Sequence, residues 1–183
     1  MSEKFPHLNE RHFEFIQKQP LFFVATAGET GFVNTSPKGM DSLRVINKNK
    51  VVWLNLTGSG NETATHVAEN GRMTLMFCSF DKQPLILRLY GNANVTHAHD
   101  DKWNDLAGMF PSYTGARQIF ELDITLVQDS CGFAVPFLEF KGERETLTNW
   151  ADKRGRESVK SYWEEKNTLS INNKDTGIKN RRP

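Results

Sequence analysis

The stretch QIFELDITLVQ, residues 118–128, decides the class of fold. From Phe120 to Leu126 every second side chain is apolar, and the side chains between them are polar. A period of two places alternate side chains on opposite faces of a strand, and one wet face is typical of antiparallel sheets. The stretch therefore predicts a half-buried antiparallel β-strand.

Shorter apolar runs on the N-terminal side of this strand are joined by tight turns. Two hairpins are predicted, 21–27 with 32–35 across the turn 28–31, and 44–46 with 51–56 across the turn 47–50. In the last of these runs, the alternation from Val52 to Thr57 indicates one face in a core and the other near a site or an interface. Further strands are predicted at 72–80 and 85–95.

Helical periodicity and helix-ending residues predict helices outside the strands, at 9–19, 62–69, 99–109, 143–153 and 157–166. Hairpins outnumber strand–helix–strand units. The fold class is therefore predicted to be mainly β with peripheral helices, built as a six-stranded antiparallel β-barrel.

The length of 183 residues predicts a single domain, 1–183, with a helical C-terminal segment at about 143–166. The polar tail, 167–183, is expected to be ordered only if something holds it. A net charge of +1 gives no overall attraction to nucleic acid or anionic lipid. No run approaches the roughly 18 apolar residues of a membrane span, so we expect a cytoplasmic protein without nucleic-acid or membrane partners.

The strongest local signal for chemistry is GSGNETATH, from Gly58 to His66. Gly58 and Gly60 let the backbone approach a ligand, and the helix start that follows presents unpaired N–H groups to an anion. Ser59, Asn61 and Thr63 add small hydrogen-bonding side chains. The alternative is an ordinary capped helix start, with Asn61 or Thr63 as the N-cap.

A second polar segment, TSPKG, runs from Thr35 to Gly39 and supplies hydroxyl groups and one cation. Lys38 suits a phosphate as a point charge. The alternative is a surface turn without a ligand. Arg44 is a further local cation that fits either interpretation.

Two histidines, His97 and His99, lie next to Asp100 and Asp101 and raise the question of a metal. No third, distant ligand accompanies them, so no metal site is predicted. Cys78 and Cys131 fit neither a metal spacing nor a disulfide framework.

Five segments in order, FVATA (23–27), VNTSPKG (33–39), VWLN (52–55), GNET (60–63) and RMTLMF (72–77), resemble the pyridoxamine 5′-phosphate oxidase-like FMN-binding split-barrel family. The segments LYGNA (89–93), SCGFAVP (130–136) and ERETL (143–147) are similar to one uncharacterised subgroup of it. NTLSI (167–171) resembles that subgroup's closing motif. The resemblance spans nearly the whole chain.

The resemblance implies a split barrel that dimerises, with one FMN at each end of the subunit interface. It implies contacts from Ser36, Lys38 and the GNET turn to the FMN phosphate and ribityl chain. Residues 53–57 would run beside the isoalloxazine, and 131–136 of the other subunit would close the ring face. The implied cofactor-binding residues are Ser36, Lys38, Gly39, Asn55, Thr57, Gly58, Ser59, Gly60, Asn61, Thr63, Cys131 and Gly132.

The chain departs from the oxidase proper in its C-terminal part. The arginine-rich patch that holds pyridoxamine phosphate is missing, and Asn172–Asp175 replaces the end of the subgroup motif. The expected function is therefore an FMN-dependent oxidoreductase acting on an unidentified small molecule, without an assigned catalytic residue. The alternatives are a non-catalytic module that holds haem, a deazaflavin or a flavin, and, least supported by the charge, a nucleic-acid-binding barrel.

Overall fold

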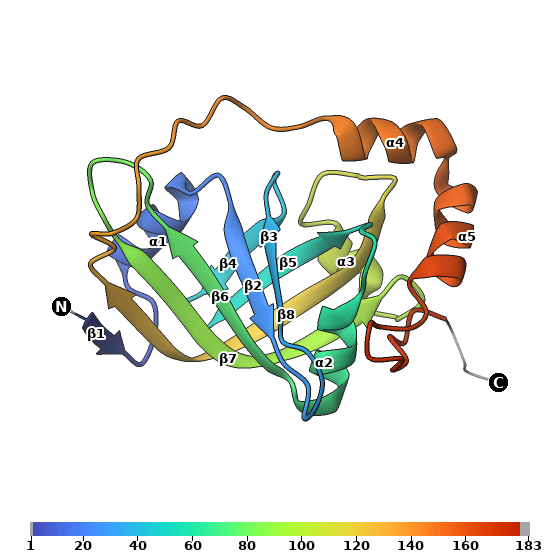
Figure 1. Ribbon diagram of the computed structural model, residues 1–183, viewed down its shortest axis with the longest axis horizontal. Helices are drawn as coiled ribbons and strands as arrows, with labels where there is room; N and C mark the ends of the chain where they lie inside the picture. Colours follow the sequence, from blue (N-terminus) through green and yellow to red (C-terminus); the bar gives the residue numbers. More distant parts are fainter. Residues whose placement is uncertain (1, 180–183) are drawn as a thin grey trace.

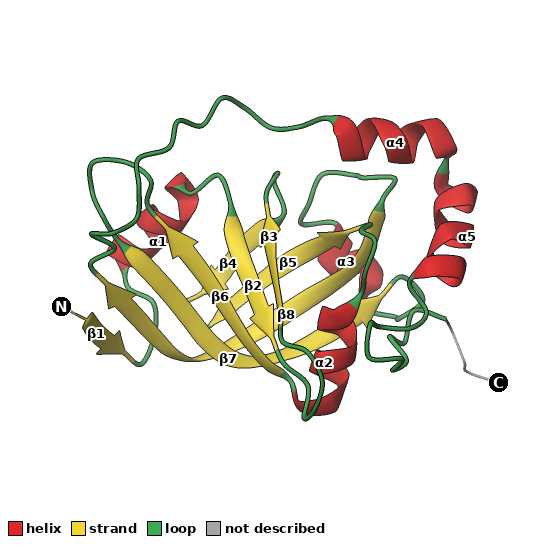
Figure 2. Ribbon diagram, viewed as in Figure 1, coloured by secondary structure: helices red, strands yellow, loops and turns green. Residues whose placement is uncertain are grey.

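Within residues 2–179, which the computed structural model describes, an antiparallel sheet of eight strands is surrounded by five helices (Figures 1 and 2). The strands are β1 Ser2–Phe5, β2 Phe22–Thr26, β3 Asn34–Lys38, β4 Leu43–Asn47, β5 Lys50–Leu56, β6 Arg72–Cys78, β7 Ile86–His97 and β8 Ala116–Ser130. The helices are α1 Glu10–Lys18, α2 Glu62–Asn70, α3 Trp103–Ala107, α4 Thr146–Arg154 and α5 Arg156–Lys166.

The strand order is β3-β2-β6-β7-β8-β5-β4, with β1 paired to β8. β8 holds the sheet together because its 15 residues pair with β7 along most of their length, with β5 at one end and with β1 at the other. The predicted six-stranded barrel is corrected to one sheet of eight strands, while its antiparallel pairing and peripheral helices are as predicted. The barrel is not closed by hydrogen bonds, since β3 and β4 end the order without pairing to each other in the described chain.

The core lies inside the curve of the sheet. Trp53 of β5 stacks on Phe120 of β8, with their ring centroids 4.5 Å apart, and both side chains are fully buried. A second cluster lies on the opposite face of β5, where Val52 and Leu54 belong to the same packed group as Leu106 of α3. β5 is therefore buried on both faces, and only its C-terminal end borders a cavity.

Several predicted elements have different bounds in the structure. β3 was predicted at 32–35 and covers Asn34–Lys38 instead, so the TSPKG segment belongs mostly to a strand and not to a turn. Pro37 is tolerated there because β3 is an edge strand. α3 is shorter than the predicted 99–109 because residues 98–102 form turns, and β1 was not predicted.

The chain after β8 leaves the sheet as a strap, defined here as residues 131–145, which arches over the top of the view to α4 (Figure 1). α4 and α5 occupy the segment predicted to be helical and share a small core of Ala151, Val159 and Trp163. No described helix has both the length and the apolar character needed to cross a membrane.

The tail returns from α5 to the side of α2, and its described part ends at residue 179. The tail is held by the rest of the chain, since three of its polar residues are buried: Asn167, Ser170 and Thr176. The sequence predicts an ordered tail only in that case. The last four residues of the predicted tail lie outside the described residues.

Candidate functional site

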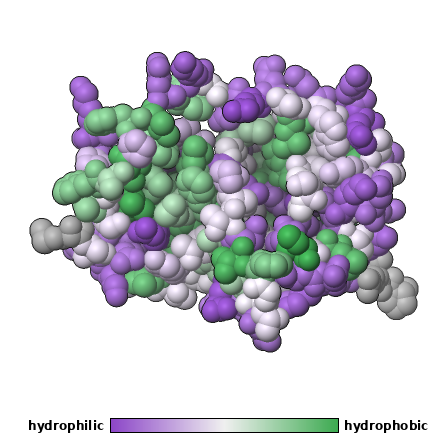
Figure 3. All heavy atoms as spheres, in the orientation of Figure 1, coloured by the Kyte–Doolittle hydropathy of each residue, from purple (hydrophilic) through white to green (hydrophobic). Residues whose placement is uncertain are grey.

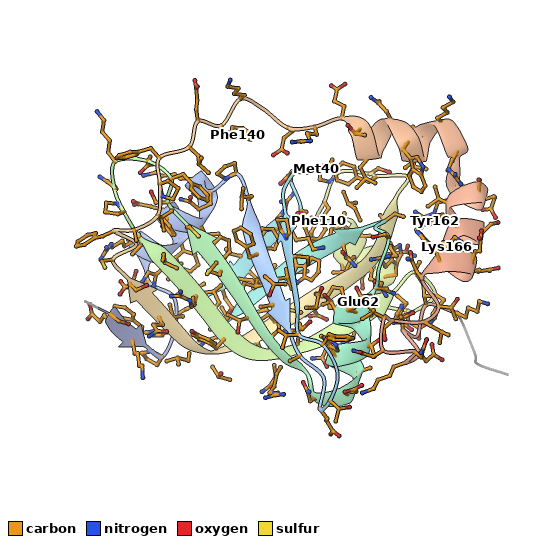
Figure 4. The ribbon with its side chains drawn as sticks, viewed as in Figure 1. Met40, Glu62, Phe110, Phe140, Tyr162 and Lys166 are labelled. Atoms are coloured by element: carbon orange, nitrogen blue, oxygen red, sulfur yellow. The ribbon has the colours of Figure 1, made fainter. Side chains whose placement is uncertain are left out.

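A cavity of about 410 Å³ lies between β3, the end of β5 and the start of α2. Ten of the twelve residues predicted to bind a cofactor line it: Ser36, Lys38, Gly39, Asn55, Thr57, Gly58, Ser59, Gly60, Asn61 and Thr63. Met40 and Glu62 line it as well. Figure 4 shows Met40 near the top of the view and Glu62 lower down, at the start of α2.

The strand geometry of β3 explains which of its side chains face the cavity. Asn34, Ser36 and Lys38 are half-buried, whereas Thr35 and Pro37 between them are exposed. A period of two thus turns Ser36 and Lys38 to the same side. The prediction of a loop was wrong here, but the two side chains that it selected lie together at the cavity.

Lys38 is a half-buried amine beside an aromatic ring. Its Nζ lies 5.5 Å from the centre of the Trp53 ring. Burial, and then the nearby Arg117, lower the pKa of Lys38 to about 8, whereas Glu62 acts in the opposite direction. Lys38 is therefore a cation whose charged form a bound anion would stabilise.

The loop from Thr57 to Asn61 is anchored at its first residue. Thr57 donates both its N–H and its Oγ1 hydroxyl to the Gly115 carbonyl, at 2.9 Å each. Trp163 of α5 donates its Nε1–H to Thr57 Oγ1 at 2.8 Å. The C-terminal helices therefore help to place the loop that precedes α2.

The start of α2 is not capped by a side chain. Asn61 occupies the N-cap position but makes no capping hydrogen bond, and its Nδ2 donates to the Asn167 carbonyl at 3.5 Å. Thr63 accepts a hydrogen bond from Asn34 Nδ2 at 3.1 Å. The alternative of a helix start capped by Asn61 or Thr63 is therefore not what the structure has, and the first N–H groups of α2 are left for another partner.

Arg117 of β8 is the residue that the sequence interpretation missed. It lines the cavity with only 3% of its surface exposed. Its Nη1 donates to the carbonyls of Gly60 and Gly58, at 3.1 and 3.4 Å, and to Asn167 Oδ1 at 2.6 Å. Its Nε has no partner within the described residues, and burial lowers the pKa of Arg117 to about 10.

A signal for Arg117 exists in the sequence. It directly precedes the predicted strand 118–128, and a charged side chain inside a buried strand is rare unless it is paired or functional. Extending the strand by two residues, to its observed start at Ala116, would have exposed the anomaly.

One carboxylate balances the two cations in part. Glu62 raises the pKa of both Lys38 and Arg117, and its Oε1 accepts a hydrogen bond from the Ile171 N–H at 3.3 Å. The cavity wall thus carries two positive groups and one negative group. Two buried acceptors beside it, Asn55 Oδ1 and Asn61 Oδ1, have no partner in the described chain.

The other two predicted residues, Cys131 and Gly132, do not line this cavity. They lie where β8 ends, and Cys131 borders a separate surface hollow with Ser2 and Glu3. Gly132 has a left-handed φ of 62° and lies close to Leu85. The family resemblance implies that both residues lie against the cavity of a second subunit, and their position within one chain does not test that prediction.

The histidines and Arg44 also lie outside the cavity wall. His97 stacks on His99, with ring centroids 5.3 Å apart, and burial lowers the pKa of His97 to about 4. Arg44 is engaged elsewhere, since it pairs with Asp41 and donates to the Met109 carbonyl at 2.8 Å. The described residues include no group of three or more potential metal ligands.

Comparison with known proteins gives one consistent result. Residues 8–131 match the family model described as pyridoxamine 5′-phosphate oxidase. A pyridoxamine 5′-phosphate oxidase family protein of Aspergillus flavus, ustO, is 44% identical over 134 residues, which cover 70% of this chain and 54% of that protein. The chain thus spans about half the length of this curated relative.

Solved structures share the fold at low sequence identity. A variant of HupZ from Group A Streptococcus is 17% identical with a TM-score of 0.54, over 67% of this chain and 98% of that one. A candidate pyridoxamine 5′-phosphate oxidase from Lactobacillus delbrueckii is 20% identical with a TM-score of 0.54, over 67% of this chain and 94% of that one. At these identities the likeness concerns the fold alone.

Proposed function

The chain belongs to the pyridoxamine 5′-phosphate oxidase family, and we propose that it binds FMN in the cavity between β3, β5 and α2 and acts as an oxidoreductase on a small molecule. The observation that carries this proposal is the set of buried polar groups at the cavity that lack a protein partner. They include both donors and acceptors, as a flavin mononucleotide requires.

The donors suit the phosphate end of FMN. The uncapped start of α2 presents N–H groups, and Lys38 and the Nε of Arg117 add positive charge beside it. Helix N-termini and basic side chains together are a recurrent phosphate-binding arrangement. Glu62 limits the attraction for a phosphate. Its carboxylate offsets one of the two positive charges, so the cavity wall has a net charge of one positive unit.

The acceptors suit the ribityl chain and the ring of FMN. Asn55 Oδ1 and Asn61 Oδ1 are buried without partners, and a flavin offers ribityl hydroxyls and a ring N–H that could donate to them. The volume of about 410 Å³ lies within the range of cavities that hold cofactors, roughly 300–1,000 Å³. The residues present therefore fit FMN.

When bound, FMN would supply hydride transfer, and the protein would supply orientation and electrostatics. Ser36 and Lys38 of β3 would hold the cofactor from one side, and the loop before α2 from the other. No side chain of the cavity is assigned as a general acid or base.

A haem-binding function is not supported by a specific feature of this chain. Histidine is a common haem ligand, but His97 and His99 lie outside the cavity wall. His97 is further enclosed by the tail, because a methyl group at Gly177 would lie 3.1 Å from His97 Nε2. A non-catalytic flavin carrier would use the same cavity and differs from the main proposal only in the reaction.

We also propose that two chains form a homodimer that completes the site. The strap carries exposed apolar side chains, with Phe133 and Phe137 at 80% and 77% exposure. Phe140 lies on the strap, apart from Tyr162 and Lys166 of α5 (Figure 4). Apolar side chains gather over the side of the molecule where the strap leaves β8 (Figure 3). Such a patch marks a contact surface.

The test is a visible absorbance spectrum of the purified protein, with mass identification of any cofactor released on unfolding. Protein with flavin bands and released FMN is expected, or apo protein that gains them on titration. Colourless protein that takes up no FMN would overturn the proposal. Anaerobic reduction of the bound flavin by NADH or NADPH, followed by reoxidation with candidate acceptors, separates an oxidoreductase from a carrier, which would turn over with none of them.

A further inference from the structure

A junction between the C-terminal tail and the loop before α2 lies beneath the cavity. Its central residue is Asn167, the first residue after α5, whose side chain and backbone are fully buried. Asn167 Nδ2 donates to the carbonyls of Gly58 and Ser59, at 3.1 and 3.2 Å. Its Oδ1 accepts from Arg117, and its own carbonyl accepts from Asn61 and Thr176.

The junction fixes which way the loop faces. The carbonyls of Gly58, Ser59 and Gly60 all accept hydrogen bonds from Arg117 or Asn167. In a trans peptide the C=O and the next N–H point in opposite directions. The N–H groups of Ser59, Gly60 and Asn61 therefore point away from this pair, and within residues 2–179 none of the three donates to a protein acceptor.

A row of successive N–H groups leading into an uncapped helix start is an arrangement that holds a phosphate. Two buried groups beside it point independently to a missing ligand. Arg117 Nε and Asn61 Oδ1 lie on side chains that are 3% and 2% exposed, both residues line the cavity, and neither atom has a partner in the described chain.

We infer that Asn167 of the tail is a positioning residue, which acts with Arg117 to hold the 58–60 loop with its N–H groups turned toward the phosphate of the bound flavin. This inference rests on the proposed function and adds to it that the C-terminal tail is part of the cofactor site. Removing the phosphate from the ligand should therefore remove most of the contribution of Asn167 to binding.

The test compares FMN with riboflavin, which lacks the phosphate. Dissociation constants are measured by quenching of flavin fluorescence on the wild type, Asn167→Ala and Asn167→Asp. Asn167→Ala removes the hydrogen bonds from this side chain to the Gly58 and Ser59 carbonyls. The loss should weaken FMN binding by about tenfold or more, and riboflavin binding by less than about threefold. Asn167→Asp should weaken FMN binding further, because it loses the donor and adds a negative charge near the phosphate.

The matched control is Asn104→Ala, the same substitution at an exposed position of α3. It should leave both affinities unchanged. Thermal unfolding of each apo protein checks that the variants fold. If Asn167→Ala is too unstable to measure, amide hydrogen exchange of the wild type still tests the inference. In the wild type, FMN should slow amide hydrogen exchange of residues 167–176, and riboflavin should do so much less.

The outcomes separate the two proposals. Equal loss of FMN and riboflavin affinity in Asn167→Ala, or no loss of either, would overturn the role of Asn167 and leave FMN binding intact. Exchange in the tail that responds equally to both flavins would also overturn it. A wild type that binds neither flavin would overturn the proposed function, and this inference with it.

Discussion

Lys38 is the residue whose protonation bears most directly on ligand binding. Burial and Arg117 lower its pKa to about 8, so the free protein loses this charge at mildly alkaline pH. A phosphate dianion favours the charged form, and binding above pH 8 then requires uptake of a proton. FMN affinity should fall by up to about tenfold per pH unit from pH 8 to 9.5.

Fluorescence titration across pH 7–9.5 measures this dependence, and above pH 7.5 the FMN phosphate, with a second pKa near 6, is almost entirely a dianion. Lys38→Arg should flatten the profile, because a guanidinium keeps its charge throughout. Riboflavin affinity should change little in either protein. An FMN profile that is flat in the wild type would show that Lys38 does not meet the phosphate.

His97 affects the stability of the fold at acidic pH, whereas Lys38 affects ligand binding at alkaline pH. Its pKa is lowered to about 4, chiefly by burial and then by His99, whereas Asp100 and Asp175 raise it and Arg117 lowers it. The unfolded chain binds a proton near pH 6.5 and the folded chain resists it, so stability present above pH 6.5 is lost as the pH falls toward 4. The free energy of unfolding should decrease over that interval.

Urea denaturation at several pH values between 4 and 7 tests this expectation. Carboxylates also titrate there, so the comparison that matters is with His97→Gln, which cannot take up the proton. The variant should show a shallower loss of stability between pH 6.5 and 4. Parallel curves for the two proteins would mean that His97 is protonated in the folded state as readily as in the unfolded one.

At the scale of elements, the pairing of β7 with β8 depends on a glycine. The register shifts between Tyr90 and Gly91, and a methyl group at Gly91 would lie 2.0 Å from the Asp123 carbonyl oxygen. Gly91→Ala should therefore force the two long strands apart and destabilise the protein by about 3 kcal/mol, measured by urea denaturation. A change below about 1 kcal/mol would contradict the close approach of these strands.

Gly108→Ala is the control for this substitution. Gly108 ends α3 with a helical φ of −61°, which alanine adopts without strain. The free energy of unfolding of the Gly108→Ala variant should stay within about 1 kcal/mol of the wild-type value.

The elements that have a local pattern in the sequence were predictable. The alternation in 118–128 placed β8, and Asn9 and Pro20 placed α1, whose capping box pairs Asn9 with His12. The end of α2 at Gly71, with a left-handed φ of 68°, follows the same logic.

Elements that depend on distant partners were not predictable. β1 exists because it pairs with residues 127–130 at the end of β8, which lie far from it in the sequence. β3 contains Pro37 and ends before Gly39, a composition typical of a turn, and is a strand only because β2 offers it an edge.

The site divides in the same way. The small polar residues at 35–39 and 57–63 were found because each segment is continuous in sequence. Arg117 was missed because the predicted strand began one residue after it, and Asn167 was missed because its bond to Arg117 spans 50 positions and has no local signature.

For the whole molecule, the strap is the feature that a single chain leaves unexplained. It crosses from β8 to α4 with hydrogen bonds at few points, among them the Leu138 N–H to the Phe80 carbonyl and the Met40 N–H to Glu143. Its Phe137 and Phe140 remain 77% and 58% exposed. Since apolar surface of this kind is stabilised by burial, a second copy of the chain is the occupant that we propose.

Size-exclusion chromatography with light scattering, at several protein concentrations, tests this assembly. The wild type should have the mass of a dimer, and the double variant Phe137→Ser, Phe140→Ser should shift toward the monomer because burial of two phenylalanine rings is lost. Phe32→Ser is the matched control. Phe32 is 67% exposed but lies at the turn between β2 and β3, at the far end of β2 from the strap in Figure 1, and its substitution should leave the mass unchanged.

If the partner's strap also closes the cavity, the monomeric variant should bind FMN more weakly than the control at equal protein concentration. A wild type that is monomeric at every concentration would contradict the dimer, and a monomeric variant with unchanged FMN affinity would restrict the cofactor site to one chain.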